Sequence, residues 1–146
     1  MGITRIGAKE IRTALNRWGE AIEADVKRIV VETAKLLKTE AVARAPEDTT
    51  ALKQSIKVHI LNDGLTAIVT VGVHYAIYVE FGTGIYAVNG NGRKTPWAYL
   101  DPKGRKDENG DPLWIWTRGM EAQPFWFPAI KIAQDYFEKE MRKLGR

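Results

Sequence analysis

Apolar residues recur every three or four positions over the first third of the chain, which is the spacing of one face of an α-helix. The pattern predicts helix over residues 8–45, ending at Ala45 because the residue before a proline is pushed out of helical geometry. Gly19 can divide this segment into a short and a longer helix, since glycine weakens a helix by about 1 kcal/mol relative to alanine. The apolar positions are Ile11, Leu15, Trp18, Ile22, Val26, Ile29, Thr33, Leu37 and Ala41.

A short polar segment follows this helix, and beyond it apolar residues alternate with polar ones. Asp48 is placed to cap one helical turn over residues 49–54. The alternation over residues 56–60 and 65–73, with Asn62-Asp63-Gly64 between them, is typical of two strands joined by a tight turn. We therefore predict a β-hairpin with one buried face.

The second half of the chain begins with another alternating segment, Tyr75–Phe81, which predicts a third strand and places antiparallel strands over residues 55–83. Residues 84–123 are rich in glycine and turn residues and contain two aromatic runs around a polar centre. This composition predicts an exposed, mobile loop with a second hairpin. A helical pattern returns over residues 125–144, where Pro128 suits the first turn.

These elements predict an α+β fold, with a long N-terminal helix and a C-terminal helix packed on a small antiparallel β-sheet, and an extended loop and β-hairpin insertion. The length of 146 residues fits a single domain over residues 1–146. The lack of cysteine excludes disulfides, a thiolate nucleophile and cysteine-based metal sites. No apolar stretch approaches the roughly 18–20 residues that span a bilayer, so we expect no membrane association and a cytosol-like compartment.

Charge is spread evenly along the chain, whereas aromatic residues are not. The 22 Lys and Arg residues exceed the 18 Asp and Glu residues only slightly, and no segment forms the basic block that is typical of a nucleic-acid-binding arm. In contrast, 13 of the 14 aromatic residues lie between Tyr75 and Phe137. We therefore expect the binding surface of the protein in the second half of the chain.

No combination of residues indicates a catalytic, cofactor or metal site. His59 and His74 fall on predicted strands and have no ligand partners at metal-binding spacing. The segment Asp107–Asp111 imitates the start of a calcium loop but lacks the glycine and the glutamate that such a loop requires, which favours a solvated hairpin tip. Glu80 has no second acid nearby, so a structural ion pair, with Arg118 as a candidate partner, is favoured over catalysis.

The aromatic residues of the second hairpin are the candidates for a binding surface. Interface cores are enriched in aromatic side chains, which favours a contact between subunits. Proteins that bind single-stranded nucleic acid also stack bases on aromatic side chains, but they combine them with a cationic groove. This hairpin carries acidic residues among its basic ones, so we favour a subunit interface or a small satellite core over base stacking. The four candidates are Trp97, Tyr99, Trp114 and Trp116.

Three blocks of sequence carry a more specific signal. The first is Ala-Pro-Glu-Asp-Thr after the long helix, the second is Tyr-Ala-Ile-Tyr-Val-Glu-Phe-Gly-Thr, and the third joins Thr-Arg-Gly to Pro-Phe-Trp-Phe-Pro-Ala. Together, and in this order, they resemble the phage tail-component family typified by the tenth gene product of phage HK97. Thr50 stands where that family prefers glycine, and the family implies no conformation for the segment 85–120. The matching residues are Pro46, Asp48, Thr49, Leu52, Ser55, Tyr75, Tyr78, Glu80, Phe81, Gly82, Thr83, Thr117, Arg118, Gly119, Pro124, Phe125, Pro128 and Ala129.

This resemblance implies a structural or assembly protein of a tailed bacteriophage or prophage, and not an enzyme. It implies a tail-completion or head–tail joining component that assembles into a ring, taken as a hexamer, around the DNA channel. The implied partners are other copies of the chain, neighbouring phage head-completion or tail proteins, and genomic DNA that passes without sequence-specific binding. The implied location is the virion, after assembly in the host bacterial cytoplasm, and no cofactor is implied. The alternative is a single-stranded nucleic-acid-binding module that uses the hairpin aromatics.

Overall fold

The computed structural model describes residues 4–5, 7, 9, 11–13, 16, 19 and 22–144. Contacts among them form two compact units, which we call the helical unit (up to Ala76 and from Pro124 onward) and the insertion unit (Ile77–Gln123). The predicted α+β class is confirmed. The helices are α2 (Glu23–Arg44), α3 (Thr50–Ser55), α4 (Ala76–Phe81) and α5 (Trp126–Leu144), and the strands are β1 (Thr4–Arg5), β2 (Ile56–Leu61), β3 (Thr66–Val71), β4 (Trp97–Leu100) and β5 (Trp114–Thr117).

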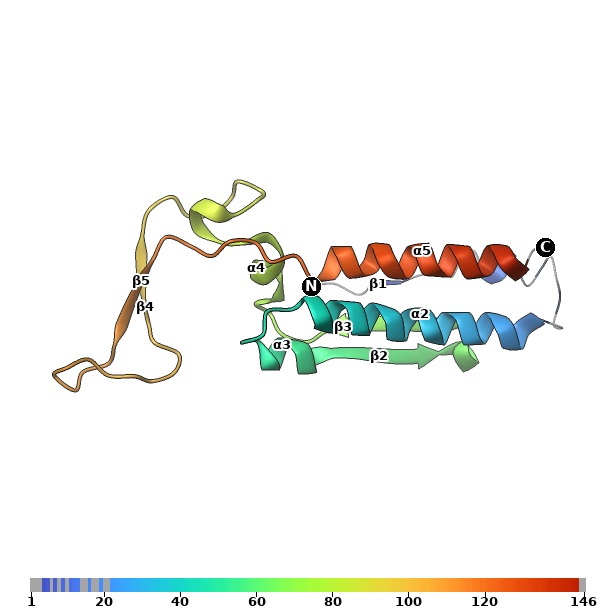
Figure 1. Cartoon of the computed structure of the whole chain (residues 1–146), viewed down its shortest axis with the longest axis horizontal. Coiled ribbons are helices and arrows are strands. Elements are labelled where there is room, and N and C mark those ends of the chain that lie inside the picture. The colour runs from blue at the N-terminus through green and yellow to red at the C-terminus, as the bar shows by residue number, and fades with distance from the viewer. Residues whose placement is uncertain are drawn as a thin grey trace. The chain divides into compact units, whose positions relative to one another are not determined.

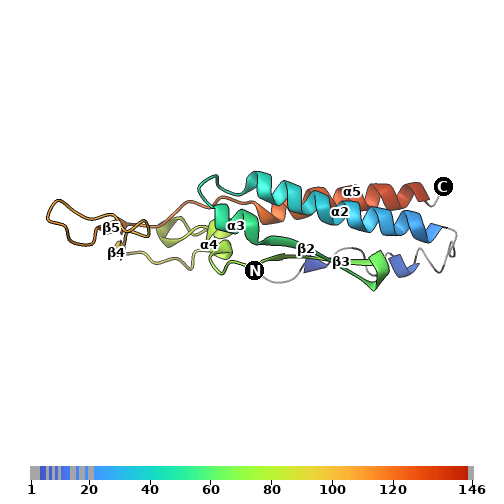
Figure 2. The same ribbon diagram turned by 90° about the horizontal axis from the view of Figure 1, so that it is seen from below.

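Two layers build the helical unit. Helices α2 and α5 lie side by side and run in opposite directions over a three-stranded antiparallel sheet with the order β1-β3-β2 (Figures 1 and 2). Residues three or four positions apart share one face of a helix, and the buried residues of both helices follow this spacing. The core therefore lies between the helices and the sheet, and its fully buried side chains include Val26, Ile29, Leu37, Leu52, Ile56, Ala129 and Ala133.

Helix α2 lies inside the segment 8–45 that the sequence predicts as helical. It ends at Arg44, and Ala45 before Pro46 has the extended backbone that a following proline imposes. Residues 11–13 are also helical, and Gly19 has a φ of 75°, which is outside helical geometry. Leu15 and Trp18 of the predicted apolar face lie outside the described residues.

Strands β2 and β3 form the expected hairpin, in register from Ile56 opposite Val71 to Leu61 opposite Thr66. Its turn places Asn62, Asp63 and Gly64 in the left-handed region, with φ values of 51°, 55° and 94°. Asparagine, aspartate and glycine are the residues that tolerate this conformation best. The turn chemistry therefore explains why the pairing reverses here.

The predicted third strand over residues 75–81 is wrong, because this segment forms helix α4. In the helix, the buried residues are Ala76, Val79 and Glu80, which share one face, while Ile77 and Tyr78 are exposed. A short segment that is apolar almost throughout fits a period of two and a period of 3.6 equally well. As a consequence, His74 lies in the turn before α4 and not on a strand.

The cap that we predicted for the short helix is also wrong in detail. Helix α3 begins at Thr50, and its N-cap residue is Thr49, which makes no side-chain capping bond. Instead, the Thr49 hydroxyl donates a hydrogen bond to the Pro46 carbonyl oxygen at 2.6 Å. Asp48 is therefore not the capping residue. Thr50 is helical and does not need the positive φ that a glycine would supply.

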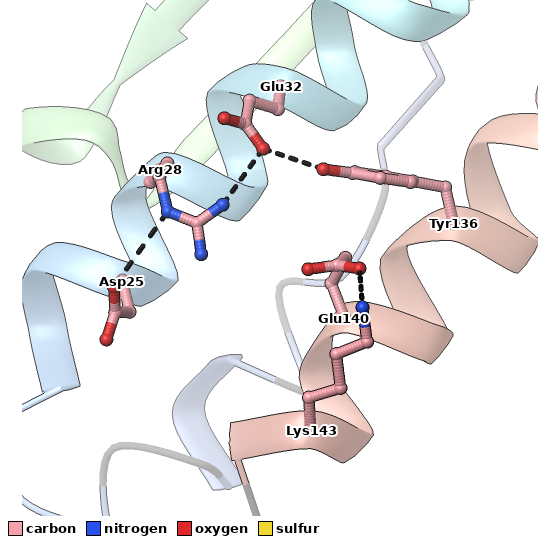
Figure 3. Close-up of polar contacts among 6 residues, drawn as sticks. All are labelled: Asp25, Arg28, Glu32, Tyr136, Glu140 and Lys143. Atoms are coloured by element: carbon pink, nitrogen blue, oxygen red, sulfur yellow. Dashed lines mark hydrogen bonds and ion pairs between the residues drawn. The ribbon is translucent and has the colours of Figure 1, made fainter.

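A polar network joins α2 to α5 on the surface of the helical unit (Figure 3). The Tyr136 hydroxyl donates a hydrogen bond of 2.6 Å to Glu32, which also pairs with Arg28 at 3.1 Å. The bond to the Glu32 carboxylate, together with partial burial, raises the pKa of Tyr136 to about 12. The neutral phenol is thus the form that holds the two helices together.

The insertion unit contains the second hairpin, β4 paired with β5. Asp101 organises its turn: the carboxylate accepts hydrogen bonds from the backbone N–H groups of Lys103 and Arg105, and from Arg105 Nε at 2.6 Å. The Arg105 side chain lowers the pKa of Asp101 below its usual value. A buried carboxylate with this number of donors fixes the loop that follows β4.

Candidate functional site

Two sequence blocks that are far apart in the chain meet in the insertion unit. The Thr83 N–H donates to the Met120 carbonyl oxygen at 2.9 Å, and the Ile85 N–H donates to the Arg118 carbonyl oxygen at 3.1 Å. In return, the Met120 N–H donates to the Thr83 hydroxyl oxygen at 2.9 Å. These bonds join the segment after α4 to the segment after β5, so they close the base of the long insertion.

Glycine is required on both sides of this crossing. Gly84 has a φ of 62°, and a Cβ there would overlap the Arg118 carbonyl. Gly119 has a φ of 129°, and a Cβ there would overlap the Thr83 carbonyl. Because both backbones touch where a side chain would start, the crossing can form only with glycine at these two positions. This contact explains why glycine follows the second sequence block at position 84 and ends Thr-Arg-Gly at position 119.

A groove of about 440 Å³ opens beside this crossing, and we call it the glycine groove. Glycine backbone forms part of its wall, and the exposed side chains of Ile77 and Tyr78 line another part. Among the residues that line it, the Arg93 guanidinium lies 5.6 Å from the centre of the Trp97 ring, the geometry of a cation–π contact. The lining residues are Ile77, Tyr78, Phe81, Gly82, Thr83, Gly84, Ala87, Asn89, Asn91, Gly92, Arg93 and Trp97.

The hairpin divides its four aromatic candidates between two faces. Residues directly opposite one another across two strands point to the same side of the ribbon. Trp116 faces Ala98 and Trp114 faces Leu100, so both tryptophans lie on one side. We call the surface of Leu100, Trp114 and Trp116 the indole face; 73% of Trp116 and 59% of Trp114 are exposed. Trp97 and Tyr99 lie on the opposite side, with Ile115 and Thr117.

Residues that could carry catalysis or bind a metal are scattered. Within the described part of the chain, no three His, Cys, Asp or Glu side chains cluster as metal ligands would. His59 contacts Thr70 on the neighbouring strand at 3.4 Å. The Asp107 carboxylate accepts the N–H groups of Asn109 and Asp111, each at 2.9 Å, so it is occupied by its own turn. Over the same described residues, no helix has the length and apolar character needed to cross a bilayer.

Comparison with known families gives a match over residues 9–82, to the family described as "Bacteriophage HK97-gp10, putative tail-component". The match takes in just over half of the 146 residues. The chain belongs to this family. Comparisons with curated proteins and with solved structures gave no match.

The HK97-gp10-like match ends at Gly82, the residue that follows α4. It therefore includes α2, the first hairpin and α4, and leaves out the indole face and most of the glycine groove. The match thus covers a large part of the helical unit but not α5.

The first block of HK97-gp10-like residues supports the helical unit. Leu52 is fully buried, and the Ser55 hydroxyl donates to the Leu52 carbonyl oxygen at 2.7 Å, which closes helix α3. The Ser55 carbonyl oxygen in turn accepts the Gly72 N–H at 3.2 Å, next to the end of β3. Together with Pro46 and Thr49, these residues fix the connection between α2 and β2. We find no exposed reactive side chain among them.

The last block also has a structural place. Phe125 and Ala129 are fully buried, and Pro128 lies in the first turn of α5, where it needs no N–H partner. Glu80 is 3% exposed in the structure, and its pairing with Arg118 stays a prediction. Sequence reasoning found the aromatic candidates but missed Gly92 and Arg93 of the groove. The density of glycine over residues 82–92 was the signal available for them.

Proposed function

We propose that this chain is a structural assembly protein of a tailed bacteriophage or prophage, a tail-completion or head–tail joining component that forms a ring around the DNA channel. The observation that carries the proposal is the match of residues 9–82 to the HK97-gp10 tail-component family. Its partners would be further copies of the chain, with six as the expected ring number, and neighbouring head-completion or tail proteins. It would act in the virion after assembly in the bacterial cytoplasm, and without catalysis.

The distribution of apolar surface supports an assembly role. Exposed tryptophan is uncommon on monomeric proteins and is enriched at the centres of protein interfaces. The insertion unit exposes Trp114 and Trp116 on a hairpin of two strands. A hairpin of two strands is only marginally stable by itself and gains stability from a neighbour that packs on its face. These properties are expected of a protein whose exposed apolar side chains become buried on assembly.

The charge of the chain suits a channel through which DNA passes. The excess of four positive charges is small and spread over many segments. Stronger attraction would hold the phosphate backbone and oppose passage of the genome. We therefore propose that genomic DNA passes the ring without sequence-specific binding.

Co-expression tests this proposal. The chain would be produced with the proteins encoded next to its gene, and complexes would be purified, weighed by light scattering and imaged by electron microscopy. We expect closed rings, either of this chain alone or bound to a head-completion or tail protein. A chain that remains monomeric at high concentration and binds none of these neighbours would overturn the proposal.

The alternative, a module that binds single-stranded nucleic acid, is supported only by the exposed tryptophans. Such binding would quench tryptophan fluorescence and fall steeply with salt, because phosphate contacts release counterions. The loop at the end of the hairpin has mixed charge and is not a cationic groove, because acidic residues such as Asp107, Glu108 and Asp111 lie among its basic ones. Titration of the chain with oligonucleotides at low salt decides between the two: a flat signal removes the alternative.

A further inference from the structure

Three of the five asparagines in this chain are followed directly by glycine, in the pairs Asn89-Gly90, Asn91-Gly92 and Asn109-Gly110. Asparagine is a thermolabile residue, and a glycine after it has no side chain to hinder attack of the glycine nitrogen on the asparagine side chain. All three asparagines are exposed. Residue type and exposure therefore do not rank the three pairs, and the local hydrogen bonds decide which of them reacts.

Two of the three glycine nitrogens are already engaged. The Gly90 N–H donates to the Ala87 carbonyl oxygen, and the Gly110 N–H donates to the Asp107 carbonyl oxygen, each at 3.1 Å. Before either nitrogen attacks a side chain, its hydrogen bond has to break. The loss of one such bond slows the reaction by about fivefold.

The pair Asn91-Gly92 has neither restraint. Among the described residues, the Gly92 N–H and the Asn91 side chain have no hydrogen-bond partner. In contrast, the Asn89 side-chain oxygen accepts the Asn91 N–H at 3.2 Å, which holds the Asn89 side chain in its own turn. Asn91 also lines the glycine groove. This pair therefore reaches the reactive arrangement without first breaking a hydrogen bond of its glycine nitrogen or of its side chain.

We propose that Asn91 is a site of spontaneous deamidation, with water as the co-reactant, and that the product remodels the glycine groove. The Gly92 nitrogen gives its proton to the solvent and forms a bond to Cγ of Asn91. The bond from Cγ to the side-chain nitrogen breaks, and this nitrogen takes a proton from the solvent and leaves as ammonia. Water then opens the succinimide ring to a carboxylate, so one water is consumed and one ammonia is released. This proposal does not rest on the proposed function.

The product changes the groove in two ways. Addition of water to Cγ gives aspartate, whereas addition to the former backbone carbonyl gives isoaspartate, whose main chain is longer by one methylene group just before Gly92. A Cβ on Gly92 would overlap the Gly84 carbonyl, so the two backbones are in contact and the longer chain displaces them. Either product also adds a negative charge to a groove in which Arg93 is the one charged residue among those that line it.

Ageing of the full-length chain in mildly alkaline buffer tests the site. Fragmentation mass spectrometry locates the modified residue, and a methyltransferase specific for isoaspartate labels that product. In the folded chain, Asn91 should react at least about fivefold faster than Asn89 or Asn109. In urea, where the hydrogen bonds are lost, the three should react at comparable rates. Equal rates in the folded chain, or a faster reaction at Asn89 or Asn109, would overturn the proposal.

Two substitutions supply matched controls for the site. Asn91→Gln should remove most of the acidic species that ion-exchange chromatography separates after ageing. Asn109→Gln, which alters the same dipeptide at the far end of the hairpin, should leave that species in place. If the acidic species persists in Asn91→Gln, another residue is the main site and the proposal is wrong.

Hydrogen exchange tests the effect on the groove. The Ala87 N–H donates to the Gly84 carbonyl oxygen at 3.3 Å, and this is the carbonyl that the Gly92 backbone contacts. Exchange at the Ala87 amide should accelerate in the isoaspartate fraction. Freshly prepared Asn91→Asp carries the charge without the added methylene group and should keep the rate of the unmodified chain. Unchanged exchange in the isoaspartate fraction, or equal acceleration in Asn91→Asp, would contradict the proposed displacement of the backbone.

Discussion

The two units of this chain keep their shape by different means. The helical unit buries apolar side chains between two helices and a sheet, with Val26, Ile29 and Leu37 fully buried. The insertion unit instead relies on backbone contacts at Gly84 and Gly119 and leaves the side chains of Trp114 and Trp116 exposed. Burial of apolar side chains stabilises the helical unit without a partner. The insertion unit leaves apolar surface exposed, and we therefore propose it as the binding surface and the helical unit as the framework.

The largest effect on stability should come from the core of the helical unit. Phe137 on α5 is 2% exposed and belongs to a cluster with Ile29, Val30 and Met141. Phe137→Ala should lower the free energy of unfolding by about 3–5 kcal/mol, because it removes buried surface and leaves a cavity. Urea denaturation followed by circular dichroism measures this. A loss below about 1 kcal/mol would contradict the assignment of Phe137 to a closely packed core.

A smaller but more local effect should come from the glycine crossing of the insertion unit. Gly84→Ala should destabilise this unit by more than about 2 kcal/mol, since it adds an overlap with Arg118 to the strain of a positive φ. Gly110→Ala is a matched control, with a φ of 85° and open space around the position, so only the strain applies. Hydrogen exchange at the amides of Thr83 and Ile85 should accelerate in the first variant alone. Equal effects of the two substitutions would show that the close approach has no energetic weight.

Replacing one buried hydroxyl group in the helical unit should raise the stability of the protein. Thr33 is 2% exposed, and its hydroxyl oxygen has no hydrogen-bond partner among the described residues. Thr33→Val keeps the shape and removes the cost of this unpaired group, so stability should rise by about 1 kcal/mol. Leu37→Val, in the same helix face, is the control and should lower stability. A loss of stability in Thr33→Val would mean that the hydroxyl has a partner.

The weakest effect should appear at high pH, through the helix pair. The hydrogen bond to Glu32 raises the pKa of Tyr136 to about 12. The folded chain therefore holds this proton more tightly than the unfolded chain, whose tyrosines titrate near 10. The contribution is fully present below pH 10 and is lost as the pH rises from 10 through 12. In Tyr136→Phe, this part of the decline should disappear, whereas an unchanged pH profile would exclude the network of Figure 3 as its cause.

Sequence patterns predicted the elements whose geometry is set locally. The buried stripe of α2 and the turn at Asn62-Asp63-Gly64 follow from residues close together in the chain, and both are present. Helix α4 was predicted as a strand because six residues are too few to distinguish the two periods. Whether this segment forms a helix or a strand depends on which of its side chains the fold buries. The local sequence pattern does not contain this information.

The candidate site was predicted only in part, for a related reason. The tryptophans of the hairpin stand out by residue type, but their division between two faces depends on the pairing register of β4 with β5. The glycine crossing joins residues 82–85 to residues 118–120, a contact between distant segments that composition does not specify. Glycine content indicated turns there, and only the structure indicates that the glycines allow two backbones to touch.

The central claim is that the insertion unit binds partners and the helical unit supports it. Sedimentation velocity of Trp114→Ala/Trp116→Ala, alone and with the neighbouring phage proteins, tests this most directly. The control is Ile60→Ala/Leu61→Ala, which removes two exposed apolar side chains from the helical unit. We predict that the tryptophan variant unfolds at nearly the same urea concentration as the natural chain but no longer assembles, while the control assembles normally. Normal assembly of the tryptophan variant, or loss of assembly in the control, would contradict the account.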